Sequence, residues 1–484
     1  MRDHQSNMYR VFILVIITLV GVFFVFLVPV YQGPDEQIHY GTIQYQAEPQ
    51  EKSWSITEQR NVALIDDITS YHLSDETIAG GKLNQFDELK WQSENTQSFS
   101  PTGIIGINED SFEQKTYKRY LTLSPPNTSG TISFYYTLTS LSEKIFSYLH
   151  FSERFFLMRL FSLILYLGVI ILTYQVAQKI FSSSLEQALF TLLVAFQPML
   201  LATGTIVNID IALIFSFTLC FFTLVTLLRR PSSKIFHLLL LLSLFLAFFS
   251  KGPGVVLIPL VCIFYLFLIQ RHYHLDRLNF LKLSLFLSVL FSLSLLFLVP
   301  KGYFASITRL VPQSHFISPL ESLTTYFDKT ISTDALLRTH ASYWGHFGWL
   351  DAKISTTLLH AITLIELIAW LGIILFFFSK KTKDYLPKKS IIILSLGIVF
   401  LLQLAIRLYD WRVFDTTGKI LIGTPGRYFL PTLIPHLIIL VTGLGFLITK
   451  NKAQFITLLK ALTIGMIFLC LYAIFNVIIP RYYL

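Results

Sequence analysis

The sequence predicts an all-α, polytopic integral membrane protein, a prediction that rests on composition, apolar runs and charge placement. Of 484 residues, 53% are hydrophobic and 14% are charged, whereas a soluble domain carries about 25% charged residues. Uncharged apolar runs long enough to cross a hydrocarbon core of roughly 30 Å recur along the chain. Basic residues gather in every second connection between those runs. We therefore expect a single membrane domain over residues 1–484.

Eleven apolar runs are predicted to span the membrane, because each approaches the length that a transmembrane helix needs. The segment from Ser250 to Gly254 divides the run over 236–270 into two short spans. The predicted spans lie near residues 11–31, 155–177, 187–206, 210–228, 236–250, 254–270, 281–300, 356–378, 391–406, 429–448 and 457–479.

The basic residues predict the orientation of these spans. If the N-terminus is cytoplasmic, every inner connection is basic, as the positive-inside rule requires, and the C-terminus with Arg481 lies outside. The formal charge of +9 then reflects topology and does not indicate nucleic acid. The first apolar run is too long for a signal peptide and is predicted to remain as an anchor, in what we take to be a bacterial plasma membrane. The inner basic residues are Arg2, Arg10, Lys179, Arg229, Arg230, Lys234, Arg271, Arg277, Lys282, Lys380, Lys381, Lys383, Lys388, Lys389, Lys450 and Lys452.

Three outer segments are predicted. Residues 32–153 form a large loop that contains interfacial helices, around Ser140–Leu149 and around Phe156. Residues 301–355 form a second outer loop, and residues 407–428 form a short basic one. The three cysteines lie inside apolar runs without metal-ligand spacing, so neither a disulfide framework nor a zinc site is indicated.

The stretch from Gln32 to His39 places two carboxylates and a histidine directly after the first span. An acceptor hydroxyl that attacks a sugar needs a general base, and Asp or Glu is the usual one. Asp35 is the first candidate and Glu36 the second. His39 would orient an acceptor, tune a carboxylate or bind a divalent metal ion, although one histidine beside Asp-Glu is a weak metal signal. The alternative is a solvated loop with no chemistry.

A group of cations on the same side departs from the positive-inside pattern. Arg407, Arg412, Lys419 and Arg427 surround one short outer loop, and Lys251 lies in an outer Gly/Pro turn. A guanidinium fork suits phosphate oxygens and an ammonium adds a point charge. A lipid-borne phosphate is the natural partner at this depth. The alternative is contact with ordinary headgroups, or pairing with Asp410 and Asp415.

Four further polar or aromatic residues fall on the outer side. Asn208 and Asp210 lie in the hairpin before the fourth span, where they either bind substrate or cap the helix. Trp349 and Asp351 precede the eighth span, and Trp349 is either a sugar platform or an interfacial anchor.

Three segments of the sequence resemble a known family. They are Gly33-Pro-Asp-Glu-Gln-Ile-His39, Phe347-Gly-Trp-Leu-Asp351 and Gly426-Arg-Tyr428-Phe-Leu-Pro431, which occur in the same order as in the bacterial membrane family DUF2142. That family has proline where this chain has Gly33. Ser124-Pro-Pro126 with Tyr135-Tyr136 also resembles, more loosely, the Pro-Tyr element of C-type (GT-C) glycosyltransferases, whose first outer loop and number of spans are similar.

The resemblance implies a GT-C-like fold, Asp35 as the catalytic base and a polyprenyl-phosphate-linked sugar as the donor. It implies a cell-envelope glycan, glycolipid or protein as the acceptor. Two other hypotheses remain open: a transporter or flippase for a lipid-linked glycan, and a non-catalytic envelope-assembly protein. Transport predicts polar residues at mid-membrane depth, and Glu366 with Gln403 are the few that this sequence offers.

Overall fold

A computed structural model describes residues 2–47, 133–273, 318–332, 335–348, 352–380, 383–418 and 425–483. The predicted span near 281–300, the Ser124-Pro-Pro126 element, Trp349, Asp351 and Lys419 lie outside the described residues.

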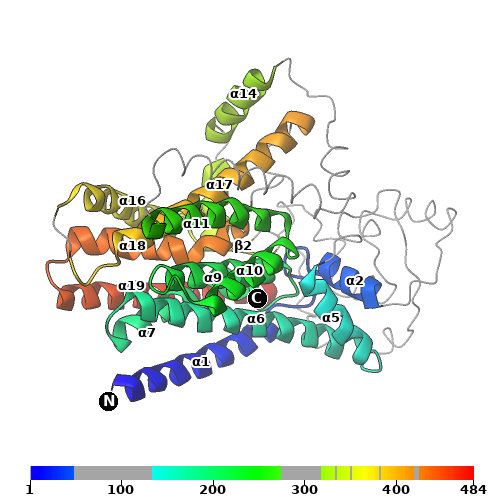
Figure 1. Ribbon diagram of the computed structural model, residues 1–484. Helices are drawn as coiled ribbons and strands as arrows, with labels where there is room; N and C mark the ends of the chain where they lie inside the picture. The colour runs from blue at the N-terminus through cyan, green and yellow to red at the C-terminus, as the bar shows by residue number, and fades with distance from the viewer. Residues whose placement is uncertain are drawn as a thin grey trace.

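Long apolar helices make up most of the described structure. Eight stretches in the described ranges are long and apolar enough to cross a membrane. In Figure 1 most of them run roughly parallel, whereas the helix over 389–417 is inclined to the others. The prediction of a polytopic helical membrane protein is confirmed, with eight such stretches described where eleven spans were predicted. The long helices are α1 (Arg2–Leu27), α6 (Phe151–Ile180), α9 (Asp210–Leu227), α11 (Leu257–Tyr273), α16 (Thr356–Phe378), α17 (Lys389–Thr417), α18 (Leu433–Ile448) and α19 (Lys452–Ala473).

Shorter elements connect and cap these helices. One two-stranded antiparallel hairpin, with β1 (His346–Phe347) pairing β2 (Ala352–Lys353), departs from the all-α prediction. The short helices are α2 (Glu36–Ala47), α5 (Phe134–Ile145), α7 (Ser184–Ala195), α8 (Pro198–Thr203), α10 (Lys234–Phe248), η4 (Gly252–Val256), α14 (Pro319–Ser332), α15 (Ala335–Trp344), η5 (Gly426–Thr432), η6 (Ile474–Ile478) and α20 (Ile479–Tyr483).

Two predicted boundaries are wrong. The run over 187–206 is not one helix, because α7 ends at Ala195 and α8 begins at Pro198. Proline lacks an N–H and favours the first turn of a new helix. In contrast, α17 continues to Thr417 and ends at Gly418, whose φ is 66°. Residues 407–417 of the predicted basic loop are therefore helical.

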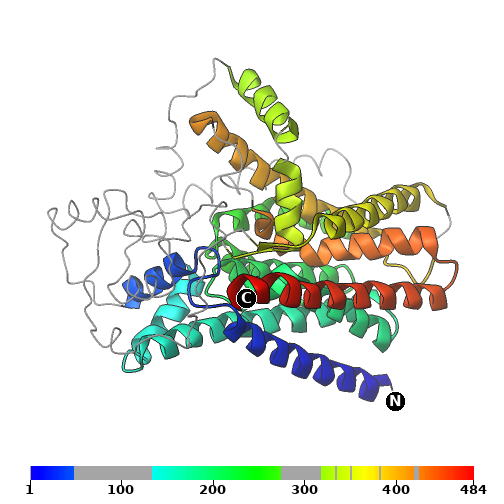
Figure 2. The ribbon, with the colours of Figure 1, turned by 180° about the vertical axis from the view of Figure 1, so that it is seen from behind.

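The basic connections that the structure describes share one end of the bundle, where Arg229 donates to Lys179 O and Lys452 donates to Ser182 Oγ at 2.6 Å. The Lys389 ammonium donates to the carbonyls of Phe377 and Ser379, both at 3.3 Å, at the end of α16. Lys383 donates to Phe446 O at 2.7 Å at the end of α18. Such cations satisfy the last carbonyls of a helix and complement its dipole. The N-terminus lies at this end, whereas α2 and α5 lie at the other, as both views show (Figures 1 and 2).

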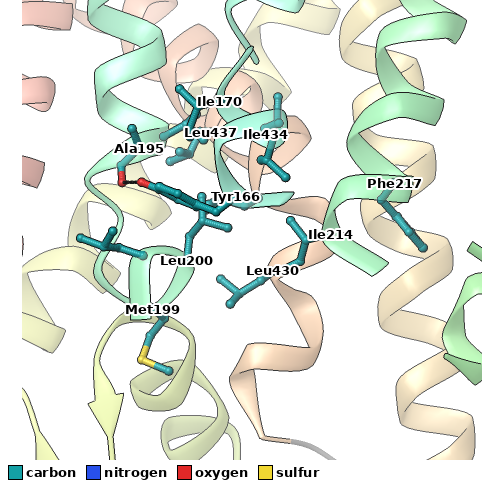
Figure 3. Packing of buried hydrophobic residues seen from close by; sticks show 14 of the residues in the cluster. Tyr166, Ile170, Ala195, Met199, Leu200, Ile214, Phe217, Leu430, Ile434 and Leu437 are labelled. Atoms are coloured by element: carbon teal, nitrogen blue, oxygen red, sulfur yellow. Dashed lines mark hydrogen bonds between the residues drawn. The ribbon is translucent and has the colours of Figure 1, made fainter. Parts of the chain in front are cut away.

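The most enclosed elements are α9 and the η5–α18 segment. In the most apolar window of α9, 94% of the residues are buried, as expected for a helix that is apolar on all sides. Figure 3 shows Ile214 of α9 near Leu430 and Ile434 of the η5–α18 segment, with the Tyr166 hydroxyl donating to Ala195 O at 2.6 Å beside them. The first residue of α9 is Asp210 and the second residue of η5 is Arg427, and both belong to the candidate site described below.

Close packing of α16 against α18 depends on paired glycines, which yields a first prediction. A Cβ on Gly443 would collide with the backbone carbonyl of Ala369, and one on Gly372 with that of Gly443. We expect Gly443→Ala to destabilise the fold by about 1–3 kcal/mol, because neither backbone can move away.

The measurement is the thermal unfolding midpoint of the purified protein in detergent. Gly465→Ala in α19 is the matched control, since no atom lies within 4 Å of a Cβ there. Equal behaviour of the two variants would contradict this account of the α16–α18 contact.

Candidate active site

The turn after α1 fixes the backbone of Asp35. The Glu36 N–H donates to Gly33 O at 3.2 Å to close the turn, and α2 begins at Glu36. Asp35 has φ 60° and Tyr31 has φ 63°, both in the left-handed region. Asp adopts this region more readily than most residues, and such strain often occurs at functional sites. The turn thus holds the Asp35 side chain in one direction.

Glu36 is the centre of a buried ion pair. Its side chain is fully buried, and Arg159 donates through Nε to Oε1 at 2.7 Å and through Nη2 to Oε2 at 2.8 Å. The Val207 N–H donates to Oε1 at 2.9 Å and the Gly33 N–H to Oε2 at 3.3 Å. With four donors around it, this carboxylate has a structural role in the described geometry. Proline at position 33 would remove one of these donors.

Arg159 also holds the end of α1. Its guanidinium donates to Val25 O at 2.7 Å and Pro29 O at 2.9 Å, and it lies 4.8 Å from the centre of the Phe155 ring. A guanidinium within about 6 Å of an aromatic ring gains a cation–π attraction. One buried arginine therefore joins α6, the end of α1 and the turn that carries Asp35.

A row of alternating charges lies beside this turn. Arg427 pairs through Nη2 with Asp35 Oδ2, and its Nε lies 3.4 Å from Asp210 Oδ2. The Lys251 ammonium donates to Asp210 Oδ1 at 2.7 Å. The Asp35 side chain remains 24% exposed, whereas those of Arg427 and Asp210 are 7% and 5% exposed. The Lys251 side chain is 28% exposed. Two cations and two carboxylates thus form a largely buried site that Asp35 and Lys251 open to the outside.

The aromatic ring of Tyr428 forms part of this site. Lys251 Nζ lies 3.9 Å from the centre of that ring. Burial alone would lower the pKa of Lys251, but the Asp210 carboxylate and Tyr428 raise it above its ordinary value. The ammonium therefore stays charged.

Glycine at position 426 lets η5 approach α15. A Cβ on Gly426 would collide with the backbone at Thr339 and Tyr343, and its N–H donates to the Ser342 hydroxyl. This contact places Arg427 and Tyr428 at the start of η5.

The central ion pair retains unused hydrogen-bonding capacity. Arg427 Nε and Asp210 Oδ2 are buried and neither makes a hydrogen bond in the described structure. Buried polar atoms without a partner are uncommon in proteins. The two atoms lie 3.4 Å apart, so their charges attract, but the geometry does not make a hydrogen bond. Because both atoms are inaccessible in this geometry, a ligand can satisfy them only when one of the two side chains moves.

Asn208 and Asp210 have different roles in the structure. Asn208 Oδ1 accepts the Asp210 N–H at 2.7 Å, which is the capping role that the sequence left open. Its amide approaches Pro34 O at 3.5 Å. Asp210 instead directs its carboxylate to the two cations.

His39 is buried beside the charge row. Its Nδ1 lies 2.6 Å from the Tyr136 hydroxyl. Burial lowers the pKa of His39 to about 4, against the opposing effect of Asp35 and Asp210, and burial raises the pKa of Tyr136 well above its ordinary value. Tyr136 therefore donates to Nδ1, and neutral His39 carries its proton on Nε2.

The three sequence segments that carry the family resemblance meet at this site. Phe347 and Gly348, from the second segment, line a cavity of about 30 Å³ together with Gly33, Pro34 and Arg427, which is room for roughly one water. Contacts also join Glu36, His39, Asn208, Asp210, Lys251 and Tyr428 to the site. Arg412 instead lies on the exposed side of α17. Trp349 and Asp351 lie outside the described residues.

Two residues of the site were not predicted. Arg159 is the more informative, because a charged residue inside an apolar span is itself a sign of function or of a buried partner. Tyr136 was noted only as part of the loose Pro-Tyr resemblance, and no local pattern predicts its contact with His39. Among the described residues, no three His, Cys, Asp or Glu side chains are arranged to hold a metal ion.

Comparison with known proteins identifies one family. The family described as "Predicted membrane protein (DUF2142)" matches residues 18–435, which is well over half of the chain. No curated protein matches the chain. No solved structure matches it.

The ion pair with Arg159 predicts that Glu36 is needed for folding. We expect Glu36→Gln to cost about 3–5 kcal/mol, because it leaves a buried guanidinium without a counter-charge. Asp35→Asn, at the partly exposed neighbouring carboxylate, should cost less than half as much. The measurement is the fraction of monodisperse protein that survives a heating series in detergent. Similar losses in the two variants would refute the difference in role.

The pKa of His39 predicts acid sensitivity. At about 4 in the folded chain against 6.5 ordinarily, His39 binds fewer protons than in the unfolded chain between these pH values. The contribution of neutral His39 to the free energy of unfolding is therefore fully present above pH 6.5. It is lost as the pH falls toward 4, a decrease of about 3 kcal/mol. His39→Asn, which keeps an acceptor for Tyr136, should reduce this pH dependence of the unfolding midpoint. The exposed His360→Asn is the control, and an unchanged pH profile in His39→Asn would disprove the assignment.

Proposed function

The chain belongs to the DUF2142 family of predicted membrane proteins, and from the geometry of its site we propose that it is a membrane glycosyltransferase. It transfers a sugar from a polyprenyl-phosphate donor to a cell-envelope glycan, glycolipid or protein. In this proposal the fold is GT-C-like and the site faces the outside of a bacterial plasma membrane. The N-terminus and the basic connections face the cytoplasm, and the C-terminus faces outward.

The observation that carries the proposal is the partly exposed Asp35 beside two cations, the buried Arg427 and the partly exposed Lys251. Arg427 and Lys251 lie at the starts of η5 and η4, two segments that lead into the membrane. A lipid-borne phosphate at the end of these segments would meet a guanidinium and an ammonium together. Asp210 and the Tyr428 ring hold both cations in place. The site thus offers a phosphate subsite next to a carboxylate.

The proposed reaction is a single displacement at the anomeric carbon. Asp35 takes the proton of an acceptor hydroxyl as its oxygen attacks that carbon. The new carbon–oxygen bond forms while the bond from the anomeric carbon to the phosphate oxygen breaks. The polyprenyl phosphate leaves with the bonding electrons, and Arg427 and Lys251 stabilise its charge. Such a displacement inverts the anomeric configuration.

The structure sets a condition on this reaction. Asp35 is paired with Arg427, so the base and a phosphate ligand compete for the same guanidinium. A bound donor would draw Arg427 onto its phosphate and release Asp35 to accept a proton. We therefore infer that the donor binds before the acceptor is activated.

Neighbouring residues have supporting roles in this proposal. Glu36 holds the turn and does not serve as base, because Arg159 occupies both of its oxygens. Neutral His39 offers its Nε2–H to a substrate oxygen. Trp349 and Asp351 remain candidate acceptor contacts, and Arg412 a candidate headgroup contact.

Transport of a lipid-linked glycan is a second candidate. It is favoured by Glu366, which lies inside α16 and hydrogen-bonds to His340 Nε2 at 2.7 Å and Trp344 Nε1 at 3.1 Å. An ionisable residue at this depth indicates function. In a transporter, Asp35 would not be required as a base, so the Asp35→Asn variant distinguishes the two candidates.

Replacing Asp35 is predicted to separate binding from transfer. Asp35→Asn should lower sugar transfer at least a hundredfold, because a general base supplies about 10²–10⁴ in rate. The same variant should bind the donor several-fold more tightly, since Arg427 no longer has a competing carboxylate. The measurements are saturable binding of a radiolabelled polyprenyl-phosphate sugar to purified protein and transfer of its label to isolated envelope membranes.

Matched variants make this test specific. Arg427→Gln and Lys251→Gln should each weaken donor binding about tenfold, whereas Arg230→Gln, at the opposite end of the bundle, should not change it. Full transfer in Asp35→Asn would remove Asp35 as the base. Absence of any saturable donor binding by the folded wild type would refute the glycosyltransferase proposal.

A further inference from the structure

A second cavity, of about 670 Å³, lies apart from the charge row. It is bounded by α15, α16, α17 and the η5–α18 segment. Phe429 and Thr432 of η5 line it, whereas Arg427 and Tyr428 at the start of η5 belong to the site already described. Its volume lies within the range typical of small-molecule pockets.

The outer walls of this cavity are apolar and exposed. Phe400 is 64% exposed, Leu336 is 50% exposed and Trp370 is 39% exposed. Phe400 and Trp370 lie within helices long and apolar enough to cross a membrane. In a membrane-spanning chain, such side chains face hydrocarbon. In the part of the chain that the structure describes, the cavity therefore opens sideways toward lipid.

One polar group of the wall is already satisfied by protein. Glu366 accepts from His340 and Trp344, and His436 Nε2 lies 3.6 Å from Glu366 Oε1. The Tyr343 hydroxyl lies 2.9 Å from His436 Nδ1. This chain of contacts makes a polar wall that needs no ligand.

Arg407 is the exception. Its Nη1 is buried and makes no hydrogen bond in the described structure. The buried carboxylate of Asp410 is linked to it through Tyr326, whose hydroxyl donates to Asp410 Oδ2 at 2.9 Å and also interacts with Arg407. The Phe429 ring centre lies 5.7 Å from its guanidinium carbon. Gln403, one turn earlier on α17, lines the same cavity. A guanidinium inside a span normally has a directly bound partner. This partly buried one meets Asp410 only through Tyr326, so it can bind a further anion.

We propose that this cavity binds a lipid phosphate, with hydrocarbon along its apolar walls and the phosphate on Arg407 and Gln403. A guanidinium binds phosphate through strong, charge-assisted hydrogen bonds, and each buried CH₂ adds about 0.8 kcal/mol. A membrane phospholipid and a polyprenyl phosphate share this chemistry. The site is separate from the Arg427–Lys251 subsite and does not depend on the proposed glycosyl transfer.

The test measures lipid binding to the purified full chain in detergent by native mass spectrometry. The probes are phosphatidylglycerol with diacylglycerol as its phosphate-free counterpart, and polyprenyl phosphate with polyprenol. We expect at least one phosphate lipid to bind tenfold or more tightly than its counterpart, and Arg407→Gln to abolish that preference. The arm that shows the preference identifies the source of the lipid.

A second variant protects the test against misfolding of the first. Val399→Trp fills the cavity without changing charge and should lower occupancy by the same lipid, whereas Arg230→Gln should leave it unchanged. Equal binding of phosphate lipids and their counterparts, or wild-type binding in both cavity variants, would overturn the proposal. If Arg427→Gln and Lys251→Gln alone remove lipid binding, the donor subsite stands and this second site does not exist.

Discussion

The buried pair between Glu36 and Arg159 is the interaction on which the candidate site depends. Moving two charges out of water is costly, and the pair is stable only because other groups complete its hydrogen bonds. Backbone N–H groups of Gly33 and Val207 serve the carboxylate, and carbonyls at the end of α1 serve the guanidinium. These partners come from separate segments, so the pair can form only when α1, α6 and the hairpin before α9 have assembled.

The same pair positions the exposed chemistry beside it. Asp35 precedes Glu36 and has a left-handed backbone, a conformation that needs support from its surroundings. With Glu36 held at its carboxylate, the preceding residue has little freedom. Asp35 therefore owes its direction to Glu36, whose own oxygens are occupied by Arg159. The two adjacent carboxylates thus differ in role: Glu36 is structural, and Asp35 is the proposed base.

How much was predictable from sequence depends on the range of each interaction. Hydropathy and charge predicted the helices and the basic end of the bundle, because both report local burial and loop composition. The break at Pro198 and the extension of α17 to Thr417 were missed, since apolar runs and charges do not show where backbone hydrogen bonds stop. Asp35, Asp210, Lys251 and Arg427 were each selected as candidates. Their pairing was not predicted, because it joins residues up to 392 positions apart.

Arg159 was missed although its signal does not depend on long-range contacts. Its signal is local, because a single arginine inside an apolar span indicates a buried partner. The position of Arg407 was also predicted wrongly. It was assigned to a loop by its charge, and only the continuation of α17 shows that it lies inside a span and beside a cavity.

In the proposed reaction, Arg427 links the base to the donor by thermodynamic reciprocity. Asp35 and a phosphate compete for the Arg427 guanidinium in this proposal. The Asp35 carboxylate weakens phosphate binding by a certain free energy, and bound phosphate weakens the Arg427–Asp35 ion pair by the same amount. Protonation of Asp35 would therefore strengthen donor binding while removing the base. Without donor, the base stays paired and cannot activate water or an acceptor. A salt bridge that looks like simple charge neutralisation thus makes the chemistry conditional on the lipid phosphate.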